Sequence, residues 1–198
     1  MNMTRIFFSI SVAILMTAMV SEDVYSQVIT MSTKSEGKVT LLFLGSGTVS
    51  VDWGDDSPKE TQKIGENKNV ISGYAHNYSG GSHTITLTGE NITHFWCYEN
   101  DITSVTITAN TSLKFLCCHT NQLTELDAGG NKSLEWLSCN GNQLNTDALN
   151  ALFETLPAGK KLKKSIFIDN TPCKQSIAAK KGWTVKYSTE GDDYDIFK

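Results

Sequence analysis

The stretch that decides the fold is LKFLCCHTNQL, residues 113–123, because it is the middle one of three copies of a single pattern. The three copies, which begin 21 residues apart, read Ile92-x-x-Phe95-x-Cys97-x-x-Asn100-x-Ile102, Leu113-x-x-Leu116-x-Cys118-x-x-Asn121-x-Leu123 and Leu134-x-x-Leu137-x-Cys139-x-x-Asn142-x-Leu144. Each copy has apolar residues at positions 1, 4, 6 and 11 and asparagine at position 9. A fixed repeat of this length predicts a chain that winds into stacked coils.

The spacing of the apolar positions explains the stacking. Positions 4 and 6 lie two residues apart on a short strand, so their side chains point to the same side. One coil alone would leave that row in water, and a neighbouring coil buries it. Where the chain bends after the strand, the asparagine amide can satisfy backbone groups, which predicts a ladder at Asn100, Asn121 and Asn142. We therefore predict a leucine-rich repeat solenoid of about three coils over residues 92–187; another β-solenoid or β-rich module is the alternative.

Three of the five cysteines, Cys97, Cys118 and Cys139, occupy the inward position 6 of the repeat. A disulfide framework would place cysteines in loops at irregular spacings. The pattern favours buried thiols that replace leucine, since a free cysteine packs as a small apolar side chain.

Residues 1–26 have the features of an export signal. Arg5 precedes a mostly apolar run at residues 6–20, which is too short to span a bilayer comfortably. We expect cleavage near residue 26 and an exported protein that is periplasmic, displayed on the cell surface or secreted, without membrane insertion after cleavage. An uncleaved membrane anchor is the alternative. The net charge of -4 and the pI near 5.5 argue against nucleic acid and anionic membranes as partners.

Residues 27–91 have a different texture. β-branched or alternating runs at 28–31, 38–44, 48–53 and 83–88 are separated by Gly, Asn, Asp and Ser clusters, which predicts a small β-sandwich. Within it, VDWGDD at 51–56, the His76-x-Tyr78 pair, Gly81 and TITL at 84–87 resemble the PKD domain, an immunoglobulin-like module of cell-surface proteins. The chain departs from that pattern at Val51, Trp53, Asp56 and His83.

The acidic residues Asp52, Asp55 and Asp56 in this module admit three interpretations. Glycine and aspartate between strands are typical of a turn, because Gly supplies positive φ and Asp bonds to its local backbone. A calcium site and an acid or base catalyst are the less favoured readings, and we expect His76 to have a structural role. The sequence predicts no cofactor, no metal ligand set and no catalytic residue.

The repeat pattern ends in a predicted closure. Asn145 and Thr146 can cap a helix that carries its apolar face at Leu149, Leu152, Phe153 and Leu156. A strand at 165–169, a short helix from Thr171 to Lys181 and a strand at 183–185 follow, and the acidic tail at 188–198 is expected to be loosely ordered. The predicted fold class is α+β, mainly β, with the solenoid capped by the β-module before it and this helix-strand-helix-strand closure after it.

The segment 92–187 resembles leucine-rich repeat surface proteins of Bacteroides-type bacteria. The half-repeat LTELD at 123–127 and the closure IAAKKGWTV at 177–185 carry the resemblance, and residues 169–173 depart from the usual Gly-Asn-Pro-Gly turn. The resemblance implies a secreted or surface-associated binding role, with no catalytic residue to carry over.

Positions 3, 5 and 7 of each copy point away from the core by strand parity, onto the face that such solenoids use for binding. The predicted ligand-binding residues on this outward face are His94, Trp96, Tyr98, Phe115, His119, Trp136 and Asn140. Exposed aromatic groups indicate an interaction site, so we expect a host or bacterial surface protein, or a glycan, as partner and no enzymatic activity. The alternatives are cover by another part of the chain and a structural role in the cell envelope. A metal site at His94 and His119 and a nucleophilic Cys117–His119 pair are both disfavoured.

Overall fold

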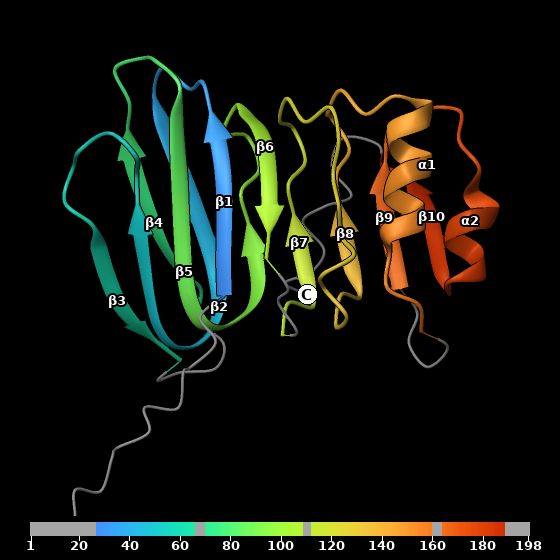
Figure 1. Cartoon of the computed structure of the whole chain (residues 1–198), viewed down its shortest axis with the longest axis horizontal. Helices are drawn as coiled ribbons and strands as arrows, with labels where there is room; N and C mark the ends of the chain where they lie inside the picture. Colours follow the sequence, from blue (N-terminus) through green and yellow to red (C-terminus); the bar gives the residue numbers. More distant parts are fainter. Residues whose placement is uncertain (1–26, 66–69, 109–111, 160–163, 189–198) are drawn as a thin grey trace, which may run out of the picture.

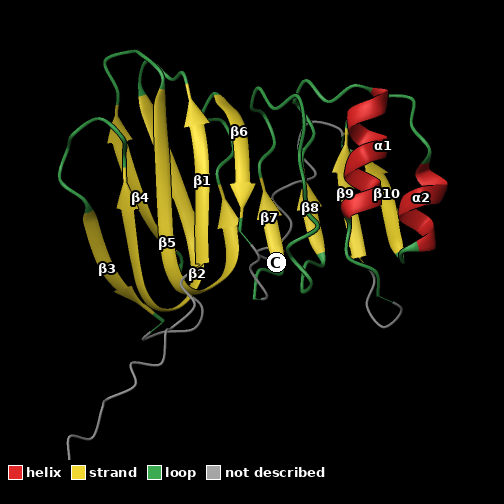
Figure 2. Cartoon of the chain, viewed as in Figure 1, coloured by secondary structure: helices red, strands yellow, loops and turns green. Residues whose placement is uncertain are grey.

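A mixed β-sheet with two short helices at one end makes up the described structure (Figure 1, Figure 2). The computed structural model describes residues 27–65, 70–108, 112–159 and 164–188. The predicted export signal at 1–26 and all but the first residue of the acidic tail lie outside them. Strand accounts for 46% and helix for 11% of the described residues, which confirms the mainly β, α+β class. Neither helix of the described part is long and apolar enough to cross a membrane.

The elements follow one another in a simple order. The strands are β1 (Gln27–Thr33), β2 (Lys38–Asp52), β3 (Glu60–Ile64), β4 (Ser72–Asn77), β5 (His83–Trp96), β6 (Ile102–Ile107), β7 (Phe115–Cys117), β8 (Trp136–Ser138), β9 (Lys164–Ile168) and β10 (Trp183–Tyr187). The helices are α1 (Thr146–Thr155) and α2 (Gln175–Lys180).

Two long strands, β2 and β5, divide the sheet into two limbs. Residues 47–51 of β2 pair with β3, whereas residues 38–43 pair with β4. Residues 83–89 of β5 pair with β1, and residues 94–96 pair with β7. Because β2 and β5 pair with each other along both parts, one limb has the order β3-β2-β5-β1-β6. The other limb has the order β4-β2-β5-β7-β8-β9-β10.

Glycines lie where the two limbs separate. The register between β2 and β5 shifts after Leu44 and again after Ser46. A Cβ atom at Gly45 would lie 2.0 Å from the Asn91 carbonyl oxygen, and Gly47 has a φ of 91°, which glycine adopts without strain. The prediction of two separate strands at 38–44 and 48–53 is therefore wrong, since both belong to β2. The prediction also missed β4.

The apolar core runs through both limbs without a break. Met31 from the first limb and Phe43 from the second belong to one buried cluster, which continues through Leu116 to Trp183 near the chain's end. β1 also pairs with β6, which lies beyond residue 91, and residue 91 itself lies inside β5. The β-rich N-terminal half therefore seals one end of the parallel strands through shared sheet and shared core.

Successive parallel strands repeat the 21-residue spacing of the sequence. His94 lies opposite Phe115, and Phe115 lies opposite Trp136, in parallel register. β9 and β10 extend the parallel array beyond β8. Leu116 and Leu137 point into the core as the pattern predicts.

The predicted asparagine ladder is confirmed by the hydrogen bonds. The Asn121 side-chain oxygen accepts bonds from the backbone N–H groups of Asn100 (3.1 Å) and Ile102 (3.0 Å), and its Nδ2 donates to the Cys97 carbonyl at 2.9 Å. Asn142 repeats this arrangement one repeat later, accepting from Leu123 N at 2.9 Å. Each of these asparagines therefore bonds one repeat to the preceding one.

The first rung of the ladder bonds to β2. The Asn100 Oδ1 accepts from Thr40 N and its Nδ2 donates to the Thr40 carbonyl, both at 2.8 Å. At the other end, Asp169 accepts a bond from Gly141 N at 2.9 Å. Both ends of the ladder are therefore bonded to a flanking element.

The three position-6 cysteines are free and buried, which confirms the prediction. Cys97, Cys118 and Cys139 are each at most 1% exposed. Burial raises the pKa of the Cys97 thiol to about 12 and that of Cys118 well above its usual value. The Cys97 and Cys118 thiols therefore stay neutral, and all three side chains pack in the core as apolar groups.

The closure after the third copy begins as predicted. The Asn145 side chain accepts a bond from Ala148 N at 2.9 Å and caps α1, and the apolar face predicted for this helix is buried. α2 begins at Gln175 rather than at Thr171, because the N–H of Lys174 bonds to the Asn150 side chain on α1 at 2.7 Å. β9 and β10 complete the parallel sheet, with both helices at this end of the molecule (Figure 1).

Candidate functional site

The outward face of the parallel strands carries three rows of side chains. Position 3 of each repeat contributes His94, Phe115 and Trp136, which are direct neighbours across β5, β7 and β8. Position 5 contributes Trp96, Cys117 and Ser138, and position 7 contributes Tyr98, His119 and Asn140. All seven predicted ligand-binding residues therefore come from adjacent strand positions or from the residues that directly follow each strand. We call this surface the ring face.

The rings on this face stack in two lines. Phe115 and Trp136 have centroids 3.9 Å apart and planes 9° from parallel, and His94 lies 5.7 Å from Phe115. In the second line, Tyr98 and His119 stack at 4.9 Å with planes 10° apart. Ring stacking of this kind fixes side-chain rotamers and makes a rigid, flat surface.

The ring face forms a hydrophobic cluster of its own, separate from the core. Its buried members are Trp96, Phe115 and Cys117, and four partly buried residues pack against them, namely Leu42, Leu44, Tyr98 and Trp136. This separation confirms the predicted outward direction of positions 3 and 5, while the main core takes positions 4 and 6.

Three contributors were missed by the sequence analysis. Phe167 on β9 lies 5.1 Å from Trp136 and continues the line of rings, and Leu42 and Leu44 extend the face onto β2. Strand parity could have found Phe167, because it lies between the apolar residues Ile166 and Ile168, which both belong to the main core. The sequence could not have placed Leu42 and Leu44 on this face, since the repeat pattern does not predict that β2 pairs with β5.

The expected exposure is wrong for three of the seven predicted ligand-binding residues. Trp96 is only 5% exposed, Phe115 4% and His119 7%, while His94, Tyr98, Trp136 and Asn140 are partly buried. Parity sets the direction of a side chain but not what lies above it. The rings are therefore aimed away from the core and yet largely withdrawn from solvent.

The two histidines of the ring face lie in different lines of rings. The imidazole of His94 is within 2.9 Å of Thr93 Oγ1, and that of His119 is within 2.9 Å of Thr120 Oγ1. Burial lowers the pKa of His94, and the positive charge of Lys114 adds to this effect. The described residues contain no group of three or more His, Cys, Asp or Glu side chains placed to hold a metal ion.

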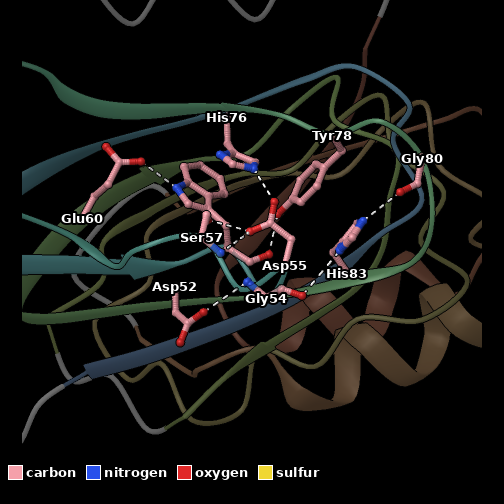
Figure 3. A network of polar contacts seen from close by, with 10 residues as sticks. Asp52, Gly54, Asp55, Ser57, Glu60, His76, Tyr78, Gly80 and His83 are labelled. Carbon is pink, nitrogen blue, oxygen red and sulfur yellow. Dashed lines mark hydrogen bonds and ion pairs between the residues drawn. The ribbon is translucent and has the colours of Figure 1, made fainter.

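The acidic turn at 52–56 lies at the other end of the molecule and forms a closed polar network (Figure 3). Asp55 Oδ2 lies 2.6 Å from His76 Nε2, and Asp55 Oδ1 accepts the Ser57 hydroxyl at 2.6 Å. His76 stacks on Trp53 at 4.9 Å, and the Tyr78 hydroxyl donates to the Trp53 carbonyl at 2.6 Å. Figure 3 also draws the bond from the Trp53 indole nitrogen to Glu60 at 2.7 Å.

The geometry of this network supports a structural role. The Ser57 hydroxyl donates to Asp55 rather than to His76, so the three residues do not form the hydroxyl–imidazole–carboxylate chain of a nucleophilic triad. The bond from Ser57, and then the bond with His76, lower the pKa of Asp55 from 3.8 to about 2. Asp52 is engaged elsewhere, with Gly54 N at 3.1 Å and Lys59 at 3.1 Å.

A groove of about 750 Å³ lies between β6, the segment 124–130 and α1. Val105 and Leu126 belong to its lining, and Glu125, Asp127 and Asp147 give it a negative charge. This charge disfavours anionic ligands, and none of the residues predicted as site members lines the groove.

The comparisons with known proteins yield no relative. No family model, no curated protein and no solved structure matches the chain.

Proposed function

We propose that the protein is an exported, non-catalytic binding module that recognises a surface protein or a glycan through the ring face. The observation that carries this proposal is the stacked line His94, Phe115, Trp136 and Phe167. These side chains stand at positions that the core does not use, and aromatic residues on such a face are favoured anchors of interfaces.

The 21-residue register and the asparagine ladder support the interpretation of residues 92–187 as leucine-rich repeat coils. Under this proposal the N-terminal half is a PKD-like cap on the first coil. Coils of this kind keep their inward positions constant and use the strand face for recognition. The bonds that Asp55 makes to Ser57 and His76 support a structural role for the acidic turn, in line with the non-catalytic part of the proposal.

The export signal at residues 1–26 remains a prediction, and the proposed location outside the cytoplasm depends on it. Expression of the full chain in a Gram-negative host tests this part directly. We expect the protein in the periplasmic, outer-membrane or medium fraction with its mature end near residue 27. Retention of residues 1–26 on a cytoplasmic protein would contradict the proposal.

The binding test uses the mature chain, residues 27–198, against glycan arrays and extracellular protein panels. A Trp136→Ala, Tyr98→Ala variant removes two partly buried rings without opening the main core. We expect it to lose at least tenfold in affinity for any partner of the ring face. The matched control is Val70→Ala, Ile71→Ala, which removes exposed apolar side chains elsewhere and should bind normally.

Two outcomes would overturn the ring face as the binding site. One is a partner that the Trp136→Ala, Tyr98→Ala variant binds as well as the parent does. The other is equal loss in the control variant, which would indicate non-specific hydrophobic adsorption. Circular dichroism of each variant verifies that the fold is kept.

A structural or assembly role in the cell envelope is the second candidate function, and the separate apolar cluster of the ring face favours it. A face of large rings that avoids solvent suits a permanent contact as well as a transient one. Light scattering separates the two functions. A concentration-independent oligomer that the Trp136→Ala variant disrupts supports assembly, whereas a monomer favours ligand binding.

A further inference from the structure

The strand β6 has one open edge. It pairs with β1 on one side and stands at the end of its limb, with no further strand beside it among the described residues. Gln122 closes only the start of this edge, where its N–H donates to the Ile102 carbonyl at 2.8 Å. Beyond that bond, residues 104–107 of β6 line the groove that faces α1.

The pairing with β1 shows which backbone groups this open edge presents. Thr108 donates its N–H to the Val28 carbonyl at 3.1 Å, so its backbone groups point toward β1. In an antiparallel pair every second residue does so, and the register is unbroken from Ile107 to Ser104. The N–H and C=O groups of Val105 and Ile107 therefore point into the groove, where no described residue bonds to them.

The side chains around the groove complement a basic ligand. Val105 and Leu126 are its buried apolar members, and Glu125, Asp127 and Asp147 are exposed carboxylates. None of the described lining residues is Lys, Arg or His, so the chain supplies these carboxylates with no cation of its own in the groove. The volume of about 750 Å³ lies within the range of ligand sites.

We propose that an extended, basic segment of a partner protein adds to the open edge of β6 and places its Lys or Arg side chains against the three carboxylates. In strand addition the backbone bonds supply affinity, and alternate side chains supply specificity. Successive side chains of the added strand point to opposite faces, so apolar residues can alternate with the cations. The groove shares no residue with the ring face, and this proposal does not depend on the function proposed for that face.

A second copy of the chain fits the same edge poorly. Pairing two copies through β6 would bring the three carboxylates of one copy close to those of the other, and like charges across an interface oppose association. A small metal ion also fits poorly, because the described residues contain no set of three ligands placed to hold one. The open backbone groups and the negative charge together favour a basic peptide.

Three synthetic peptides test the proposal on the mature chain. The first alternates Lys and Val, the second alternates Glu and Val, and the third is the Lys–Val peptide with methylated backbone nitrogens, which cannot donate to a strand edge. Fluorescence anisotropy measures their binding. We expect the Lys–Val peptide to bind at least tenfold more tightly than either of the others, and to weaken as salt is added.

Charge variants test the location. The Glu125→Gln, Asp147→Asn variant keeps the shape of both exposed side chains and removes two charges from the groove. We expect it to bind the Lys–Val peptide at least tenfold more weakly. The matched control is Glu36→Gln, Glu154→Gln, which removes two exposed charges outside the groove and should bind as the parent does. Equal weakening in both variants would mean unspecific attraction and would overturn the proposal.

Amide hydrogen exchange on the unaltered chain gives an independent decision, even where a variant fails to fold. The peptide should slow exchange at Val105 and Ile107 at least tenfold, while Thr106, which faces β1, should change little. A Lys–Val peptide that leaves both amides unchanged, or that binds no better than its methylated copy, would show that the edge of β6 is not the site. Failure of the Lys–Val peptide to bind would refute the proposal and leave the ring face untouched.

Discussion

The ring of Phe115 lies parallel to the indole of Trp136, with centroids 3.9 Å apart and planes 9° from parallel. The two residues are equivalent positions of successive repeats and direct neighbours across β7 and β8. Their contact joins two repeats on the side opposite the core, so the repeats touch on both faces of the sheet.

The stacking of Phe115 on Trp136 predicts a measurable coupling energy between the two rings. A double-mutant cycle with Phe115→Leu and Trp136→Leu should give a coupling energy of about 0.5–1.5 kcal/mol, the range for aromatic pairs beyond their burial. Urea unfolding of the four proteins measures it. Val70→Leu paired with Trp136→Leu serves as control and should be additive. Strict additivity of the Phe115 and Trp136 substitutions would mean that the stacking contributes no stability.

The asparagine ladder predicts that replacing Asn121 strongly lowers the stability of the protein. Asn121→Ala leaves the buried N–H groups of Asn100 and Ile102 and the Cys97 carbonyl without their partner. Because each unsatisfied buried group costs about 1–3 kcal/mol, we expect a loss of at least about 2 kcal/mol in the free energy of unfolding. The neighbouring Gln122→Ala removes one exposed bond to Asp101 and should change stability by less than about 0.5 kcal/mol. Similar losses in the two variants would contradict the ladder's role.

The lowered pKa of Asp55 predicts that the stability of the protein falls at acidic pH. The folded-state value, about 2, lies below the value of 3.8 expected without these bonds. The stabilisation is therefore complete above about pH 4 and is lost as the pH falls toward 2. Asp55→Asn should flatten the fall of the melting temperature over this interval, while Asp56→Asn, at an exposed position outside the described bonds, should not. A parent protein whose melting temperature is already independent of pH there would refute the assignment.

The core cysteines predict that thiol modification reports unfolding. Cys97, Cys118 and Cys139 are buried, and burial raises the pKa of the Cys97 and Cys118 thiols. We expect all three to be unreactive in the folded protein, whereas Cys173 is half-buried. In increasing urea, labelling of these three should follow the unfolding transition measured by circular dichroism, and Cys173 should react before it. Reaction of Cys118 at urea concentrations well below the unfolding transition would mean that neighbouring repeats separate locally before the protein unfolds.

The sequence predicts most of the repeat region because each prediction there depends on local spacing. The parity of positions 4 and 6 places Cys118 in the core, and the recurrence of Asn121 predicts the ladder. The backbone bonds of the acidic turn are also local, since Gly54 N bonds to Asp52 and Ser57 N to Asp55, whereas the contact of Asp55 with His76 spans 21 residues.

Long-range pairing explains what the sequence did not reveal. Gly45 and Gly47 read as a turn between two strands, yet they lie within β2 because the Asn91 backbone approaches Gly45 closely. β4 contains Gly73 and Ala75 and lacks an alternating apolar row, so nothing local marks it as a strand. Trp96 is 5% exposed partly because Leu42 and Leu44 of the distant strand β2 pack against its cluster, which no repeat pattern encodes.

The bonds between Asn100 and Thr40 have a consequence for how this architecture can vary. Thr40 presents its N–H and carbonyl to Asn100, so β2 already fills the place that an earlier coil would take. Asp169 closes the opposite end with a bond of the same kind. Duplicating or removing a block of 21 residues between these two ends keeps every rung in register. We therefore expect that the number of repeats can change by one or more units of 21 residues, during evolution or by design. The ring face would become wider or narrower by one strand for each repeat gained or lost.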